Sequence, residues 1–379
     1  MIETPRDDAE LVALTAEAVA NRTPLAIEGG GTKTAFGPAV EADRTVSLAG
    51  LRGISLYEPE ELVLSAKAGT PLADIEAALG DHHQKLAFDP PNWCTLWGSD
   101  PAAQTIGGIV SCGLSGPARV SAGAARDFVL GCHWVNGRAE LMRSGGRVMK
   151  NVTGYDLPKL MTGAFGTLGI LTDVTLKVLP APAFEATLDV AVDDAGDALA
   201  VMTAALQSPQ AMAAAGYDPA RQSVYLRLEG PDVSVEDRLT NLRKLRDGTV
   251  IEAQASTRLW AAHRDLEALT DEPVIWLLSI APTSMPDLMA AFPAARALVD
   301  WGGGRVALAG DVDPASLFSY LAEQGGHARL LRAPQALRRD TPFAGPLSRA
   351  EAVLSARLRD SFDPLGLFNP GRLSFAEMA

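Results

Sequence analysis

Three glycine-rich segments hold the residues whose types and spacing could bind a ligand. The first reads IEGGGTKT over residues 27–34 and directly follows a short apolar run. Consecutive glycines let the backbone turn tightly and aim several N–H groups into one concavity, and such a nest binds phosphate without side-chain charge. The spacing matches neither a Walker loop nor the GxGxxG fingerprint. Taken alone, this segment is equally compatible with a plain turn.

The other two segments are apolar and rich in glycine. The second reads AQTIGG over residues 103–108, and Ser111, Gly113, Gly116 and Gly123 follow it. It indicates close approach of the backbone to a flat ligand, with an irregular structural loop as the alternative. The third comprises KNVTGYDL over residues 150–157 and GAFGTLGILT over residues 163–172. Its glycines would let the start of an apolar strand lie against a planar ring.

The elements that must position these segments can be read from periodicity and turn residues. The pattern predicts a helix over residues 8–21 and a helix over residues 70–79 that Thr70 caps, with Pro71 in its first turn. Predicted strands occupy residues 25–28, 46–48, 62–66, 128–135 and 168–179. The long Pro/Gly/Ser-rich region 88–126 is predicted to be a functional loop. Pro180 and Pro182 mark a domain boundary.

After this boundary the pattern predicts a second α+β unit. Residues 184–192 alternate as in a half-buried strand, and two strands around Gly302-Gly303-Gly304 predict a hairpin. The other predicted strands are 224–228, 274–280 and 328–331. The predicted helices are an alanine-rich one that ends at about residue 206, and 234–245, 258–269 and 314–323. A last helix over residues 349–362 leads into the tail. Residues 329–372 contain eight arginines and four acidic residues, so this stretch is basic in an acidic chain.

Composition excludes several functional classes. The 379 residues carry a net charge of −13, which argues against a nucleic-acid binder. Apolar residues make up 47% and charged residues 21%, so the chain is globular rather than disordered. No run approaches the about 20 apolar residues of a membrane span, and the acidic N-terminus shows no secretory signal. We therefore expect a cytoplasmic protein, attached to the inner membrane face, if at all, through other subunits.

Cysteine and histidine provide no metal motif. Cys94, Cys112 and Cys132 are an odd number at unsuitable spacing, and three thiols cannot complete a four-thiolate iron–sulfur cluster. Adjacent His82 and His83 lie in a polar turn and are interpreted as solvated. We expect no metal site, and any electrons must leave through another protein.

The three segments, in this order, resemble the FAD-binding domain of the vanillyl-alcohol oxidase and p-cresol methylhydroxylase superfamily. That family has a glycine-rich pyrophosphate loop, an ATIGG-like segment and GTLGI before a strand. The tail FDPLGLFNPGRL, residues 362–373, resembles that of the 2-hydroxy-acid branch, where it returns to the flavin. With KNVTGYDLPKL and the moderate length, the chain most resembles the FAD-binding subunits of bacterial glycolate oxidases, which are three-subunit enzymes.

The resemblance implies an α+β fold. It implies a p-cresol methylhydroxylase-type FAD-binding domain of two subdomains over residues 1–181 and an α+β cap domain over residues 182–335. A C-terminal helix and tail over residues 336–379 would pack back on the FAD domain.

The resemblance also implies the cofactor and its contacts. FAD is expected to be noncovalent, because the loop has no histidine and Cys112 reads as a small buried hydrophobe. Carried over by position, the FAD-binding residues are Glu28, Gly29, Gly30, Gly31, Thr32, Lys33, Thr34, Thr105, Ile106, Gly107, Gly108, Ser111, Gly116, Gly123, Asp127, Thr167, Gly169, Ile170 and Asn369.

Catalysis is where the sequence departs from the family. Oxidation of a 2-hydroxy acid needs a base for the hydroxyl proton and a cation for the carboxylate, and competent members resemble one another in an HxGDGN metal motif. Here Gly310-Asp311 has no histidine near it. A loose match to the family's LWxxR element leaves His263 as a candidate base and Arg264 as a candidate carboxylate partner. The alternative is an amphipathic helix with Trp260 in the core and Arg264 in a surface ion pair.

The function implied is that of the FAD-binding subunit of a complex that oxidises glycolate to glyoxylate. The expected partners are a second FAD-containing catalytic subunit and an iron–sulfur subunit that takes the electrons. A self-sufficient FAD-linked 2-hydroxy-acid dehydrogenase and a structural subunit without catalysis remain alternatives. The basic stretch adds a docking hypothesis, in which Arg338, Arg339 and Arg349 contact an acidic partner surface. A solvated helix face is the alternative for these arginines.

Overall fold

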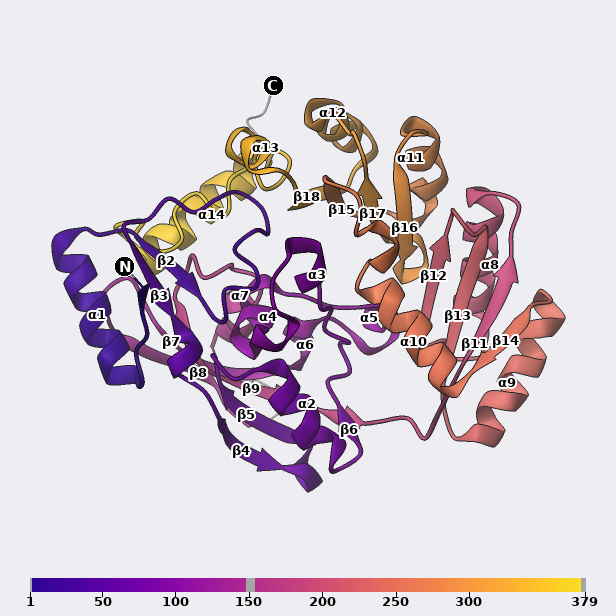
Figure 1. The fold of residues 1–379 in the computed structure, drawn as a ribbon, viewed down its shortest axis with the longest axis horizontal. Coiled ribbons are helices and arrows are strands. Elements are labelled where there is room, and N and C mark those ends of the chain that lie inside the picture. Colours follow the sequence, from indigo (N-terminus) through magenta and orange to yellow (C-terminus); the bar gives the residue numbers. More distant parts are fainter. Residues whose placement is uncertain (1, 148–153, 376–379) are drawn as a thin grey trace. The chain divides into compact units, whose positions relative to one another are not determined.

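The computed structural model describes residues 2–147 and 154–375 and divides the chain into two compact units. The first unit comprises Met1–Leu114, Ala124–Pro180 and Arg338–Ala379, and the second comprises Ser115–Gly123 and Ala181–Leu337. Both contain helices and strands, so the predicted α+β class is confirmed (Figure 1). Lys150 to Thr153 of the third glycine-rich segment lie outside the described residues.

The first unit contains a small parallel sheet next to the glycine-rich loop. Its order is β1 (Ile2–Glu3), β3 (Arg44–Ser47) and β2 (Leu25–Glu28), and helix α1 (Asp8–Asn21) lies between β1 and β2 in the chain. The C-terminal tail extends the sheet, because the backbone at Leu25 bridges Phe368 in parallel. The loop therefore leaves a strand that is paired on both sides.

The first unit also contains an antiparallel sheet of five strands. Its order is β4 (Ile54–Glu58), β5 (Val63–Lys67), β9 (Ile170–Lys177), β7 (Val129–Val135) and β8 (Leu141–Gly145). A separate ribbon pairs β6 (Gln84–Lys85) with β10 (Leu179–Pro180). Strands β5 and β9 are buried along nearly their whole length and carry apolar residues together with a few buried polar ones, such as Ser65 and Thr172.

Short helices occupy most of the region predicted as a long loop. The helical elements of the first unit after α1 are η1 (Leu48–Gly50), η2 (Pro59–Glu61), α2 (Leu72–Gly80), α3 (Cys94–Trp97), η3 (Pro101–Ala103), α4 (Ile106–Cys112), α6 (Ala125–Phe128), α7 (Leu157–Met161) and α14 (Arg349–Phe362). Helix α13 (Gln335–Asp340) spans the boundary at which the chain re-enters this unit. The region lacked periodicity because its helices are only four to seven residues long.

The predicted cap of α2 is wrong. The helix begins at Leu72 after Pro71, and its N-cap makes no side-chain hydrogen bond. The Thr70 hydroxyl instead donates to the Lys67 carbonyl at 2.6 Å and accepts the Gly53 amide at 2.9 Å. The Thr70 hydroxyl therefore stabilises the turn between β5 and α2 and does not cap the helix.

The second unit is built on an antiparallel sheet of eight strands. In spatial order these are β14 (Thr249–Glu252), β11 (Phe184–Ala191), β13 (Ser223–Gly230), β12 (Ala214–Asp218), β16 (Arg296–Asp300), β17 (Arg305–Ala309), β15 (Ile275–Ser279) and β18 (His327–Arg332). The hairpin predicted around the three glycines is confirmed as β16–β17.

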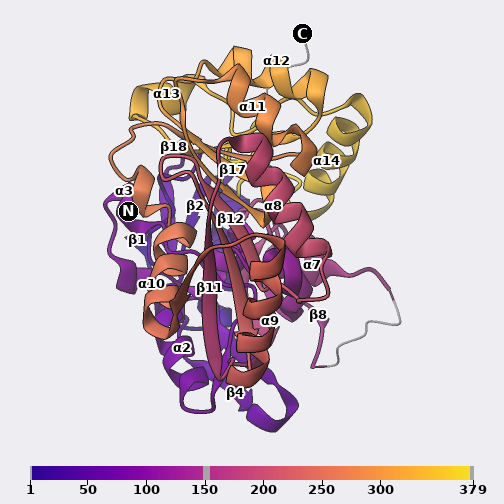
Figure 2. The same ribbon diagram turned by 90° about the vertical axis from the view of Figure 1, so that its right-hand side faces the viewer.

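Helices lie on both sides of this sheet (Figure 2). On β11, Ala186, Leu188 and Val190 belong to a core shared with α8 (Ala195–Gln207) and α9 (Asp232–Leu245). Trp260 of α10 (Ala253–Arg264) packs with Ala214 and Tyr225 in a separate cluster. The remaining helical elements are α5 (Arg119–Ala122), η4 (Glu267–Leu269), η5 (Pro282–Ser284), α11 (Met285–Ala291), η6 (Trp301–Gly303) and α12 (Pro314–Gln324).

Helix α10 lies five residues earlier at each end than the predicted helix 258–269.

Among the residues that the structure describes, no helix is both long and apolar enough to cross a membrane.

Candidate cofactor site

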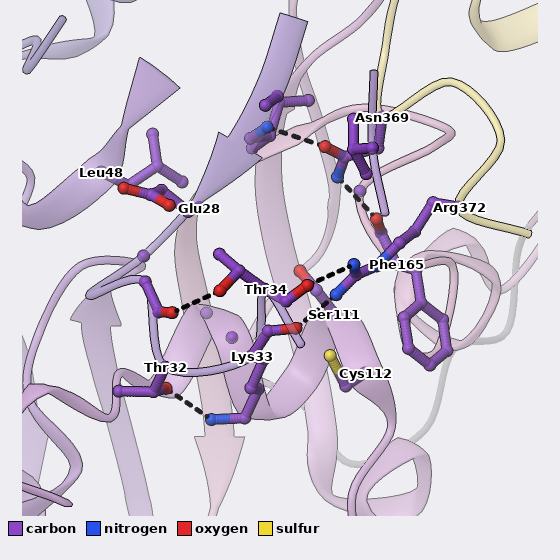
Figure 3. Close-up of a pocket in the computed structure, with 18 of the residues that line it drawn as sticks. Glu28, Thr32, Lys33, Thr34, Leu48, Ser111, Cys112, Phe165, Asn369 and Arg372 are labelled. Atoms are coloured by element: carbon purple, nitrogen blue, oxygen red, sulfur yellow. Dashed lines mark hydrogen bonds between the residues drawn. The ribbon is translucent and has the colours of Figure 1, made fainter. Parts of the chain in front are cut away.

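A cavity of about 350 Å³ in the first unit brings the three glycine-rich segments together (Figure 3). That volume falls within the range of about 300–1,000 Å³ typical of small-molecule sites. The predicted FAD-binding residues on its wall are Glu28, Gly29, Gly30, Gly31, Thr32, Lys33, Thr34, Thr105, Gly107, Gly108, Ser111, Gly169 and Asn369. The cavity is therefore made by segments that are far apart in the sequence.

Close packing explains two of the loop glycines. A Cβ atom on Gly30 would lie 1.9 Å from the Ala103 carbonyl oxygen, and one on Gly29 would lie 2.1 Å from the Thr105 hydroxyl. Both distances are below van der Waals contact, so the loop can rest on the second segment only where it has no side chain. The sequence had assigned these glycines to ligand approach, whereas contact with protein atoms already requires them.

The loop offers a row of backbone donors. In the described part of the chain, the amides of residues 29–33 donate no hydrogen bond. Thr32 and Lys33 are buried and Gly29 and Gly31 are half-buried, so most of these donors have little access to water. Buried amides are normally paired, and a row of free ones fits an anion such as a pyrophosphate. The residues present therefore fit the pyrophosphate of FAD.

The side chain of Lys33 contacts the second glycine-rich segment. Its ammonium donates to the Gln104 side-chain oxygen at 2.8 Å and to the Thr32 hydroxyl at 3.2 Å. Desolvation lowers the pKa of this buried amine. No carboxylate pairs with it among the described residues. Lys33 thus joins the loop to the second segment and adds positive charge to the cavity wall.

The second segment starts a helix at the cavity. The Thr105 hydroxyl accepts the Gly108 amide at 3.3 Å and caps α4. A Cβ on Gly107 would lie 2.6 Å from the Ala68 carbonyl, so α4 sits tightly on the segment after β5. Cys112 ends the helix, is buried, and lines the cavity. Ser111 precedes it on the same wall.

Asn369 connects the tail to two other parts of the site. Its side-chain oxygen accepts the Ile27 amide at 2.7 Å, and its side-chain nitrogen donates to the Phe165 carbonyl at 2.8 Å. Its backbone amide donates to the Leu25 carbonyl at 2.9 Å. The side-chain oxygen and nitrogen of Asn369 are thus both hydrogen-bonded to backbone groups of this chain. Asn369 therefore positions the strand before the loop, and its amide is not free to bind the cofactor.

Two arginines that the sequence did not assign to the site lie on the cavity wall. Arg338 donates to the Gly37 and Thr34 carbonyls at 2.6 and 2.8 Å. Arg372 donates to the carbonyls of Lys33, Thr34 and Pro38. The excess of arginine in the tail was the signal that could have found them. For Arg338 these bonds give the guanidinium a role within this chain, and the docking hypothesis stays a prediction.

Six predicted FAD-binding residues do not line this cavity. Ile106 and Ile170 are core residues, and the Thr167 hydroxyl donates to the Ala164 carbonyl at 2.7 Å. The Asp127 carboxylate accepts the Ala124 amide at 2.9 Å. The other two belong to the second unit and are Gly116 and Gly123.

The two candidate catalytic residues, His263 and Arg264, both contact other groups of the protein. His263 is buried, its Nε2 lies 3.1 Å from the Val299 carbonyl, and burial lowers the pKa of its imidazole. The Arg264 guanidinium pairs with the neighbouring Asp265 at 2.8 Å. Neither arrangement supports contact with a substrate. In the described residues there is also no group of His, Cys, Asp and Glu that could hold a metal ion.

Comparison with known proteins shows which family this chain resembles. The chain matches the family model of an FAD-binding domain over residues 1–145. It is 35% identical over 364 residues to the glycolate oxidase subunit GlcE of Escherichia coli, covering 96% of this chain and 95% of that protein. It is 29% identical over 188 residues to the glycolate oxidase subunit GlcD of Bacillus subtilis, and 31% identical over 185 residues to a D-lactate dehydrogenase of Anaerostipes hadrus.

The last two matches each cover 48% of this chain, and 38% and 37% of the respective relative. An alkyldihydroxyacetonephosphate synthase structure shares the fold, with a TM-score of 0.67 and 15% identity over 97% of this chain and 75% of that one. The near full-length likeness and the FAD-binding domain decide the family. The chain belongs to the FAD-linked oxidoreductase family that includes glycolate oxidase subunit GlcE, and its cofactor is FAD.

Proposed function

We propose that this chain is the FAD-binding subunit of a multi-subunit enzyme that oxidises glycolate to glyoxylate. The observation that carries the proposal is the likeness to GlcE along 96% of the chain, together with a cavity whose free amides suit a pyrophosphate. When bound, FAD supplies the oxidant that accepts a hydride from the 2-hydroxy acid.

In this proposal the chain's own residues bind and orient the cofactor. The amides of residues 29–33 bind the pyrophosphate of a noncovalently held FAD. The Lys33 ammonium adds a positive charge to the cavity wall next to the loop. Asn369 holds the strand before the loop in register with the tail. The first unit acts as the FAD domain, the second as a cap, and residues 338–375 as a tail that completes the FAD domain.

Electrons are proposed to leave through partner subunits. The three cysteines are all buried, and burial raises the pKa of Cys132 to about 12, so these thiols are poor ligands for an iron–sulfur cluster. An iron–sulfur subunit and a second FAD-containing catalytic subunit related to GlcD would complete the enzyme. We place this complex in the cytoplasm, with any attachment to the inner membrane face made by partners.

A second candidate is a self-sufficient FAD-linked 2-hydroxy-acid dehydrogenase. It is favoured by the 31% identity to a D-lactate dehydrogenase over 48% of this chain. The environments of His263 and Arg264 favour the subunit interpretation, because neither side chain is available as a base or a carboxylate partner.

Anaerobic mixing of the purified chain with glycolate tests the proposal. We expect the isolated chain to keep its flavin oxidised, and we expect dye reduction only when the partner subunits are present. Turnover by the isolated chain at about 1–1,000 per second, the usual range for enzymes, would instead establish the self-sufficient dehydrogenase. A chain that contains no flavin and binds none when FAD is added would indicate a structural subunit.

A further inference from the structure

Arg338 and Arg372 hold the C-terminal end of the glycine-rich loop, and residues 37 and 38 after it, from two places in the C-terminal region. Arg338 donates to the carbonyls of Thr34 and Gly37, and Arg372 donates to those of Lys33, Thr34 and Pro38. Both guanidinium groups bind backbone oxygen only, and neither has a carboxylate partner among the described residues.

These contacts fix the direction of the peptide groups. The N–H and C=O of a trans peptide point to opposite sides, so the bonds to the Lys33 and Thr34 carbonyls set the direction of the Thr34 and Ala35 amides, directly after the free amides of residues 29–33. A glycine-rich loop loses much conformational freedom when it is ordered. Holding its carbonyls in the free protein lowers the entropy that must be lost when a ligand binds.

The tail is placed so that Arg372 can reach the loop. The amide of Leu25 donates to the Leu367 carbonyl at 2.8 Å, and the amide of Asn369 donates to the Leu25 carbonyl at 2.9 Å. A turn follows, in which the Arg372 amide donates to the Asn369 carbonyl at 3.1 Å. Pairing of the tail with β2 therefore carries the guanidinium to the far end of the loop (Figure 3).

The cavity wall carries more positive than negative charge. Its charged residues, in the described part of the chain, are Lys33, Arg338, Arg372 and Glu28. Arg372 is 7% exposed, and desolvation lowers its pKa to about 10. A buried cation without a carboxylate is costly, and an anionic ligand in the cavity would offset that cost.

We propose that Arg338 and Arg372 form a C-terminal clasp that preorganises the glycine-rich loop and makes the site select ligands containing a pyrophosphate. The inference rests on the proposed role of the loop in holding FAD. It assigns the two arginines as positioning residues, and it assigns their charge to recognition of the pyrophosphate rather than of the flavin ring.

Titration of the full-length apoprotein with FAD, ADP and riboflavin tests the clasp. For Arg372→Gln we expect affinity for FAD and ADP to fall at least tenfold, while affinity for riboflavin stays the same, because riboflavin has no phosphate. Arg372→Lys should be intermediate, since it keeps the charge but loses the planar fork. The matched control is Arg339→Gln, which removes an exposed charge next to Arg338 and should change none of the affinities.

Thermal unfolding with and without FAD separates recognition from a purely structural role. A structural role would lower the unfolding temperature equally in both conditions, whereas the clasp predicts that the increase caused by FAD becomes smaller. Wild-type affinity for FAD in Arg372→Gln, or equal weakening of FAD and riboflavin, would overturn the inference. If that variant does not fold, Arg338→Gln and Arg372→Lys must meet the same criteria. Failure of the wild-type chain to bind FAD would instead count against the proposed function.

Discussion

Glu28 is the acidic side chain on a cavity wall that otherwise carries cations, within the described chain. It ends β2 and stands directly before the glycines. Desolvation raises the pKa of its carboxyl, and no hydrogen bond or ion pair compensates the charge among the described residues. Its ionised form is therefore unfavourable in the folded chain and repels an anion bound to the loop.

We predict that Glu28→Gln increases both the affinity for FAD and the stability of the apoprotein at pH 7. Because burial raises the folded-state pKa, the carboxyl destabilises the fold increasingly as pH rises above its ordinary value of 4.5. The gain in the urea midpoint should therefore be present at pH 7 and disappear at pH 4. Glu60→Gln, at an exposed position, is the control. An equal gain at both pH values would show that ionisation of Glu28 is not the cause.

The role of a single residue could be predicted from the sequence where it depends on neighbouring residues in the chain. The run of glycines and the position of Asn369 in the tail could be read from the sequence, and the structure places them together at the cavity. The two arginines could not be placed, because their contacts with the loop span 301 to 339 positions in the chain. The hydrogen bond from the Lys33 ammonium to Gln104, 71 residues away, could not be predicted for the same reason.

At the scale of elements, the loop depends on its contact with the η3–α4 segment. Gly30→Ala would place a methyl carbon 1.9 Å from the Ala103 carbonyl. We predict a loss of about 3 kcal/mol in the free energy of unfolding, at the upper end for overpacked sites, and loss of bound FAD. Gly80→Ala is the control, because its Cβ would meet no atom within 4 Å. Urea unfolding and flavin absorbance measure the two effects. An alanine tolerated at position 30 would show that this packing is not required.

A second element-scale feature anchors residues 115–123 in the second unit. Arg305 pairs with Asp300 at 2.5 Å and donates to the Ser115 carbonyl at 2.9 Å. The Trp301 indole donates to the Gly116 carbonyl at 2.9 Å, and the Arg119 guanidinium lies over its ring at 4.2 Å. Gly116, one of the glycines after the second segment, therefore has a structural partner in this unit.

Breaking this anchor should be costly. Arg305→Met leaves Asp300 buried without its partner, and such a loss typically destabilises by about 3–5 kcal/mol. The double variant Asp300→Asn, Arg305→Met should recover much of that loss, because no unpaired charge remains. Urea unfolding of the wild type, the single variant and the double variant provides the measurement. A double variant as unstable as the single variant would mean that the lost packing and the Ser115 contact dominate.

Elements were predictable wherever periodicity extends over several turns or strand residues. Helix α1, strand β2 and the hairpin β16–β17 follow from local pattern and turn residues. The start of α2 was missed because Thr70 forms bonds to Lys67 and Gly53 instead of capping the helix. The short helices α3 to α6 gave too few turns for a hydrophobic period to show.

At the scale of the whole molecule, the first unit is assembled from both ends of the chain. Residues from the tail line the same cavity as residues from the loop. Truncation after Asp363 removes the tail segment that bridges β2 at Phe368, together with Asn369 and Arg372. We predict loss of FAD, measured by flavin absorbance of the purified chain. Leu365→Ala, at an exposed tail position, should retain FAD. A truncated chain that still binds FAD would contradict a site completed by the tail.

The central claim is that the chain binds FAD noncovalently in the cavity of the first unit. The most direct measurement is the flavin content of the purified full-length chain before and after acid precipitation, with Gly30→Ala measured in parallel. The account predicts equimolar FAD, all of it released to the supernatant, and little or none in the variant. Flavin retained in the pellet, which would point to Cys112, or a variant with full flavin content, would contradict the account.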